Sequence, residues 1–204
     1  MKFSTGLFIL MILSFLLTSC EKDKSGITAP GEMIFTSYFP NNIGTQWTYF
    51  YYDSLANQSD TVAVQVVGDT TFEDNRNARI WEYRFQSATE RKYVEISEDT
   101  VKIYDDLNTL WINTKFIMPF EVGKKWGGDF LLDSSYVMEK LPITVIANRF
   151  TESYKIKEIW GGLNDYGLVY TWFVPGVGIV KRHHRGWSFG MANKYWELMN
   201  YKVE

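Results

Sequence analysis

The sequence predicts an all-β protein, folded as an antiparallel sandwich or half-barrel of about a dozen short strands. Three observations predict this class. Apolar and polar residues alternate in many short stretches rich in aromatic and β-branched side chains, which is the pattern of half-buried strands. Clusters of Gly, Pro, Asn and Asp separate these stretches. No sustained helical stripe follows the N-terminal segment, and parallel strands would need helical crossovers, so the strands should pair antiparallel.

The alternation places strands along most of the chain. They are expected over residues 61–66, 79–85, 92–96, 100–104, 143–146, 154–160, 169–174, 179–183 and 193–201. The last stretch also puts Tyr195, Leu198 and Met199 near one another on a helix face, but Tyr195, Glu197, Met199 and Tyr201 fit a strand about as well. We interpret it as a final strand.

An internal repeat is suggested by two segments, 40–81 and 119–160. Each begins with a proline, followed by a branched aliphatic residue, a glycine and a tryptophan at the same spacing. The glycine would allow an unusual backbone angle in a turn before a tryptophan that opens a strand. If the match is more than coincidence in an aromatic-rich chain, residues 35–204 form a single domain of two related halves.

The N-terminus has the layout of an export signal. A positive residue, Lys2, precedes an apolar run over 7–17 that is too short to span a bilayer. The run ends in Leu17-Thr18-Ser19-Cys20, which resembles the lipobox of bacterial lipoprotein precursors. The resemblance implies that residues 1–19 are a signal peptide, that cleavage follows Ser19, and that Cys20 carries a palmitate-type lipid anchor in the membrane. The alternative is an ordinary cleaved signal beside an unrelated cysteine.

Residues 20–34 are expected to be a flexible tether, because this polar stretch has too few apolar residues to bury a face. Glu21 and Asp23 resemble the surface-export signals of some Gram-negative lipoproteins, although Lys22 and Lys24 interrupt the pattern. This resemblance implies an outer-membrane lipoprotein and leaves open which face of that membrane it occupies. Cys20 is the only cysteine, so the domain is expected to fold without a disulfide.

Two segments of the body resemble uncharacterised all-β envelope lipoproteins. One is the proline-to-tryptophan motif at residues 40–47, and the other is the aromatic-rich segment 172–181, which contains Pro175-Gly176-Val177-Gly178. The resemblance implies an all-β domain and transfers no catalytic residue.

The residues of common catalytic sites are missing or scattered. His183 and His184 are the only histidines, and as neighbours on a strand they point to opposite faces, so they cannot chelate one metal ion together. There is no Gly-x-Ser-x-Gly motif, and an acylated Cys20 cannot act as a thiol nucleophile. Most acidic residues occupy positions typical of solvated surface charges. We therefore expect a non-enzyme without metal or cofactor, and a net charge of −3 gives no electrostatic attraction to nucleic acid.

Two groups of residues are candidate binding sites. Lys181, His183 and Arg185 should share one strand face and could bind an anion, or they could simply be a charged edge strand exposed to solvent. Tyr49, Tyr51 and Trp172 could line a ligand groove, or they could be covered by the core.

Three function classes fit these observations. The first is a non-catalytic binding or carrier module for an apolar or amphipathic ligand, such as a lipid. The second is a carbohydrate-binding module at the cell surface, and the third is a structural partner of an envelope protein. Rings that line a cavity would favour the first, and rings exposed in a row would favour the second. A molecule with neither, but with an exposed edge strand or apolar patch, would favour the third.

Overall fold

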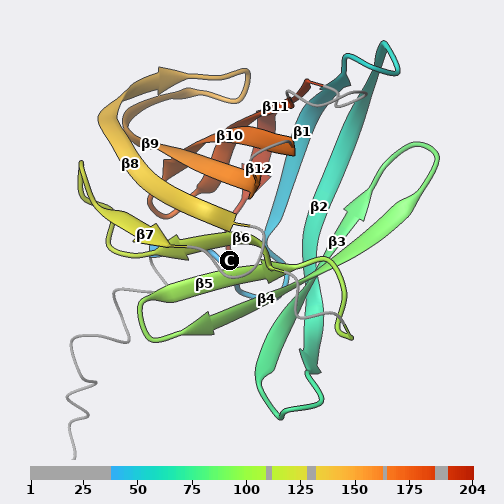
Figure 1. The fold of residues 1–204 in the computed structure, drawn as a ribbon. Helices are drawn as coiled ribbons and strands as arrows, with labels where there is room; N and C mark the ends of the chain where they lie inside the picture. Colours follow the sequence, from blue (N-terminus) through green and yellow to red (C-terminus); the bar gives the residue numbers. More distant parts are fainter. Residues whose placement is uncertain (1–37, 109–111, 128–131, 163–164, 187–192) are drawn as a thin grey trace, which may run out of the picture. The chain divides into compact units, whose positions relative to one another are not determined.

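The computed structural model describes residues 38–108, 112–127, 132–162, 165–186 and 193–204 (Figure 1). They belong to a compact unit that spans Gly31–Glu204. The predicted signal peptide, Cys20 and the tether lie outside the described residues. Within those residues, no helix is long and apolar enough to cross a membrane.

Twelve antiparallel strands form one sheet, which confirms the all-β prediction. The strands are β1 (Gln46–Asp53), β2 (Gln58–Thr71), β3 (Asn77–Arg84), β4 (Thr89–Ser97), β5 (Thr100–Tyr104), β6 (Ile112–Ile117), β7 (Lys125–Gly127), β8 (Leu132–Thr144), β9 (Arg149–Gly162), β10 (Asp165–Val174), β11 (Gly178–Gly186) and β12 (Lys194–Lys202). The alternation located most of them, but it did not show β1, β6 or β7, and the stretch 143–146 overlaps only the end of β8. The repeat did predict a strand opening at Trp47 and at Trp126, which lie in β1 and β7.

The strand order is β6-β5-β4-β3-β2-β1-β12-β11-β10-β9-β8-β7, so two six-stranded meanders meet where β1 pairs with β12. The sheet is nearly closed and barrel-like, and it curves around so that β6 and β7, its two edges, come together (Figure 1). There the indole Nε1 of Trp126 in β7 donates a hydrogen bond to the carbonyl oxygen of Lys115 in β6, at 3.0 Å. One curved sheet, and not two packed sheets, therefore encloses the core.

The core is an aromatic cluster on the concave face of the sheet. Phe39, which precedes β1, stacks on Trp81 at 5.7 Å between ring centroids and on Phe173 at 5.9 Å. Phe120, which precedes β7, packs edge-on against Phe173 at 5.1 Å. The segments that lead into β1 and β7 thus contribute buried rings to the core inside the curved sheet.

The two proline-led turns have matching hydrogen bonds. Gly44 and Gly123 both have positive φ, 97° and 89°, and their amides donate to Val66 and Val137 respectively, both at 2.9 Å. Beyond the turns, the two segments 40–81 and 119–160 no longer correspond residue by residue in the structure. Trp47 faces Val64 in the ladder, whereas Trp126 faces Ser135, because the second hairpin is shorter.

Candidate ligand-binding cavity

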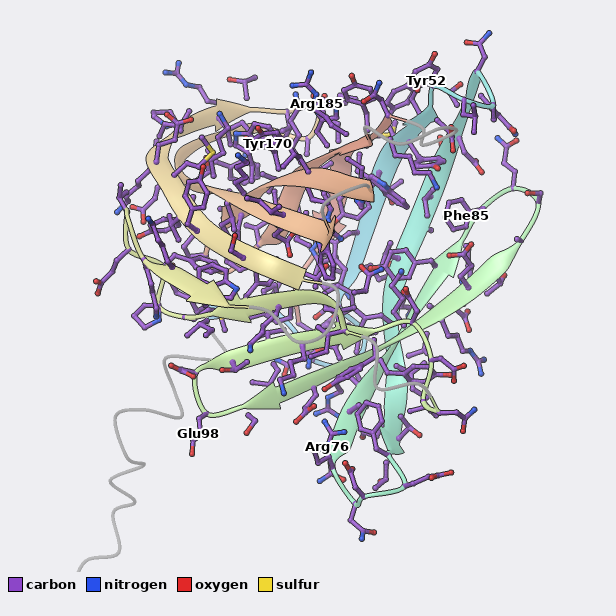
Figure 2. All side chains as sticks on the ribbon, in the orientation of Figure 1. Tyr52, Arg76, Phe85, Glu98, Tyr170 and Arg185 are labelled. Atoms are coloured by element: carbon purple, nitrogen blue, oxygen red, sulfur yellow. The ribbon has the colours of Figure 1, made fainter. Side chains whose placement is uncertain are left out.

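A cavity of about 280 Å³ opens on the concave face of the sheet, toward the ends of β1, β3 and β11. Its volume is close to the lower end of the range for small-molecule sites. Figure 2 labels Tyr52, Phe85 and Arg185 toward this end of the sheet. The lining residues come from both meanders: Tyr49, Tyr51, Trp81, Tyr83, Phe85, Glu90, Lys92, Asn113, Ile179, Arg182, His184, Lys194 and Trp196.

Aromatic rings form one wall of the cavity. Trp196 in β12 faces Tyr51 in β1 across the ladder, and their ring centroids are 4.6 Å apart. Phe85, just after β3, packs edge-on against both rings, at 5.8 Å from Tyr51 and 6.0 Å from Trp196. Tyr83 is also edge-on to Trp196, at 6.3 Å. The wall therefore offers apolar contact to a ligand body.

The tyrosines of this wall stay neutral at physiological pH. Burial raises the pKa of Tyr49 well above its ordinary value, and burial together with Asp53 raises the pKa of Tyr51 to about 12. The Tyr49 hydroxyl donates to the carbonyl oxygen of Ile179 at 2.8 Å, which fixes the ring against β11.

Two lysines at the cavity are paired with carboxylates. Lys92 Nζ lies 2.5 Å from Asp105, and Lys194 Nζ lies 3.8 Å from Asp53. Lys92 also lies over the ring of Tyr83, 5.6 Å from its centroid. Glu90 is exposed and faces Tyr83 across the β3–β4 ladder.

A buried polar cluster lies behind the cavity around Arg182. Its Nη2 donates to Thr114 at 2.6 Å and to Glu158 Oε2 at 3.4 Å, and Thr171 donates to the same carboxylate at 3.5 Å. Glu158 has no exposed surface. Burial raises the pKa of Glu158 to about 7, although Arg182, Thr171 and the backbone amide of Lys115 act in the opposite direction. Near neutral pH, then, Glu158 exchanges a proton.

His184, next to Arg182 on the cavity side, is held neutral. Burial lowers its pKa well below the ordinary value, and the charge of Arg182 lowers it further. The imidazole can therefore donate or accept a hydrogen bond in the cavity without adding a charge.

The structure brings together two of the three predicted groove aromatics. Tyr49 and Tyr51 line the cavity, but Trp172 does not. Thr171 and Phe173 point inward from β10 and are fully buried, so Trp172 points to the convex face. There the ammonium groups of Lys155 and Lys181 lie 5.5 and 5.9 Å from its ring. Trp172 is therefore not part of this cavity, and its predicted role in a ligand groove stays a prediction.

Lys181, His183 and Arg185 share the convex face of β11, and each has partners or neighbours there. Lys181 lies 3.5 Å from Glu197, and His183 stacks on Tyr195 with ring centroids 4.1 Å apart. Partial burial and then the charges of Arg185 and Lys181 lower the pKa of His183. The predicted anion site thus has a paired lysine and a mostly neutral histidine, and its role stays a prediction.

Sequence reasoning missed most of the cavity, including Tyr83, Trp196 and Arg182, and it also missed the buried Glu158 behind it. The alternation along β11 places Arg182 and His184 on the face opposite Lys181. This was the one feature of the sequence that could have indicated these two cavity residues. The sequence did not show that this face is concave, because the curvature arises from pairing between distant strands.

A second, wider hollow lies at the other end of the sheet, where β2 and β3 meet the turn before β1. It measures about 650 Å³ and is lined partly by polar residues, among them Asn41, Asn42 and Asn77. Its charged pair, Arg79 and Asp69, forms a salt bridge, and Asn41 accepts a hydrogen bond from Trp81 Nε1 at 2.7 Å. Over the described part of the chain, no group of three or more His, Cys, Asp or Glu could hold a metal ion.

Two solved structures share the fold. One is a presumed lipoprotein from Parabacteroides distasonis ATCC 8503, with a TM-score of 0.53, 15% identity, and 81% of this chain and 99% of that chain covered. The other is a presumed exported protein with a YmcC-like fold from Bacteroides fragilis NCTC 9343, with a TM-score of 0.51, 14% identity, and 81% and 98% covered. This chain has the same fold. No family model and no curated protein matches the sequence.

Proposed function

We propose that this protein is an envelope lipoprotein that binds a small amphipathic ligand inside its curved sheet and catalyses no reaction. The observation that carries the proposal is the cavity, in which the rings of Tyr51, Phe85 and Trp196 meet a polar floor at Arg182. Apolar walls with a few convergent polar groups are typical of small-molecule sites. A volume of about 280 Å³ favours a ring system or a short chain over a whole phospholipid.

The location is part of the proposal. The lipobox at Leu17–Cys20 and the fold shared with presumed lipoproteins and exported proteins support a cell-envelope protein anchored through Cys20. We propose the outer membrane as its site. In a chain exported by an ordinary cleavable signal peptide in place of residues 1–19, replacing Cys20 by Ala should release the protein from the membrane fraction, whereas the native chain should sediment with outer-membrane markers. Retention of the Cys20→Ala chain in that fraction would contradict the anchor.

A carbohydrate-binding surface is the second candidate, and the convex face offers its rings. Here, however, His183 and Tyr195 cover each other, and Lys155 and Lys181 lie over Trp172. Rings whose faces are already covered have little free surface for stacking on a sugar. The cavity therefore favours the first function.

The test is native mass spectrometry of the unit Gly31–Glu204, purified after export, followed by organic extraction. We expect one small bound molecule per chain, or stoichiometric uptake of the neutral probe N-phenyl-1-naphthylamine. Tyr51→Ala should weaken binding of this probe, whereas Tyr52→Ala, the adjacent ring outside the set that lines the cavity, should not. An empty chain that takes up no probe would contradict the proposal.

A further inference from the structure

Arg182 has donors that the protein leaves unused. Both of its hydrogen bonds, to Thr114 and to Glu158, come from Nη2. Nε is buried and has no hydrogen-bond partner among the described residues. A guanidinium has five N–H donors arranged to bind a planar anion through two of them. The Arg182 side chain also lines the cavity and is 14% exposed, so part of this incompletely paired side chain faces a ligand there.

The other titratable groups at the cavity are compensated or neutral, except Glu90. On β4, Lys92 is paired with Asp105, and on β12, Lys194 is paired with Asp53. Tyr49 and Tyr83 are neutral phenols because burial raises their pKa values. His184 is a neutral imidazole, and Glu90 is an exposed carboxylate opposite Tyr83.

Glu158 compensates Arg182 weakly. The two groups meet through one nitrogen and one oxygen at 3.4 Å, although Glu158 is fully buried and Arg182 is only 14% exposed. The other neighbours of the carboxylate named here are the hydroxyl of Thr171, the cross-strand residue Ser135 and the backbone of Lys115. A buried ion pair normally needs close geometry to offset the desolvation of both charges. The guanidinium can therefore accept a second anion.

We propose that the cavity's ligand carries one anionic group, that this group binds the guanidinium of Arg182 from the cavity side, and that Glu158 takes up one proton from solvent as it binds. The inference rests on the proposed function, because it concerns the same cavity. A second negative charge on Arg182 repels the carboxylate of Glu158 and shares the cation that pairs with it, so the neutral acid becomes the favoured form. Affinity for the anion then rises as the pH falls.

The experiment compares two fluorescent probes with the same aromatic body. 1-Anilinonaphthalene-8-sulfonate carries one anionic group, and N-phenyl-1-naphthylamine lacks it. In the unit Gly31–Glu204 we expect the anionic probe to bind about tenfold or more tightly than the neutral one, as a charge-assisted hydrogen bond allows. Its affinity should increase by up to about tenfold between pH 8 and pH 6, whereas the affinity for the neutral probe should not change.

Variants assign the effect to the two residues. Arg182→Gln should remove the preference for the anionic probe and retain binding of the neutral probe. Because Arg182→Gln leaves the buried carboxylate of Glu158 without its cation, the double variant Arg182→Gln/Glu158→Gln is also tested. It replaces both charged side chains by neutral ones of similar shape. Glu158→Gln alone should retain the preference and lose its pH dependence. Arg149→Gln, which removes the charge of an exposed arginine at the start of β9 outside the cavity lining, is the matched control and should change neither.

Each outcome separates the two proposals. If neither probe binds, the proposed function fails together with this inference. Equal affinity for both probes, or an unchanged preference in the double variant, overturns the anion site and leaves the cavity function standing. If the pH dependence survives in Glu158→Gln, the proton is taken up elsewhere, for example by His184, and the role of Glu158 is wrong.

Discussion

Glu158 shows how far a single residue can depart from its ordinary environment. Alternation along 154–160 places it on the same face as Tyr154 and Ile156, and the structure buries all three. Sequence reasoning had treated the acidic residues as solvated, because buried carboxylates are rare. The exception depends on Arg182 and Thr171, which adjoin it only after β9, β10 and β11 pair.

Stability should depend on pH through Glu158. Its pKa is about 7 in the folded protein and near its ordinary value of 4.5 in the unfolded chain. The folded state therefore holds more protons between these values, and its stability falls as the pH rises from 4.5 to 7 and is constant above. The loss is on the order of 3 kcal/mol, since one pKa unit corresponds to about 1.4 kcal/mol.

Urea unfolding at pH 5 and pH 8 measures this effect. The wild type should be less stable at pH 8, and Glu158→Gln should show a smaller difference between the two pH values. An equal difference in both proteins would assign the pH dependence to other groups.

Phe39 should be essential for packing although it lies outside every strand. It is 1% exposed and stacks on Trp81 and Phe173, rings from both meanders. Phe39→Ala should cost about 3–5 kcal/mol of unfolding free energy, since it empties a closely packed site. Phe50→Ala, a ring that is 39% exposed, is the control and should cost much less by the same urea titration.

At the level of elements, the turn before each half is the part that sequence matching located best. The proline, glycine and tryptophan recur because a turn and its hydrogen bonds depend on neighbouring residues. β7, Lys125–Gly127, has only three residues, too few to show a period, so only the repeat indicated it, through Trp126. β6, Ile112–Ile117, was missed because its inward residues include Thr114, which breaks the apolar alternation.

A substitution at Gly123 measures the backbone strain of the turn before β7 without a change in side-chain packing. Its φ is 89°, and a Cβ placed there would meet no atom within 4 Å. Gly123→Ala should therefore destabilise the protein by about 1–2 kcal/mol through backbone strain alone. Gly127→Ala is the matched control, because it too has open space but no positive φ, and its melting temperature should be close to that of the wild type. Equal melting temperatures for the two variants would contradict the strain.

At the scale of the whole molecule, two meanders are joined by a ladder at β1 and β12 and approach each other again at β6 and β7. The first contact is continuous from Gln46 to Asp53, with one irregularity between Thr48 and Tyr49. The second contact includes a side-chain hydrogen bond from Trp126. The cavity lies between the meanders, so its shape depends on both contacts.

Hydrogen exchange should show that the β1–β12 ladder is more stable than the contact between β6 and β7. Amides of β1 and β12 are central in the sheet, whereas β6 and β7 are its edges. In native-state exchange followed by mass spectrometry, peptides from β6 and β7 should take up deuterium sooner than peptides from β1 and β12, since edge strands open at lower cost. Uniform protection across the four strands would indicate that the sheet is closed by a ladder.

The sequence by itself determined the strand class and most strand positions. It also determined the alternation, which puts Tyr49 and Tyr51 on one face of their strand and Lys181 and His183 on one face of theirs. These properties depend on residues within a few positions of one another. Only the tertiary structure decided that one sheet curves into a barrel-like shape, that Trp172 lies outside it, and that Arg182 meets Glu158 behind an aromatic cavity. Those contacts join residues far apart in the chain, and their positions follow from the register of many strand pairs together.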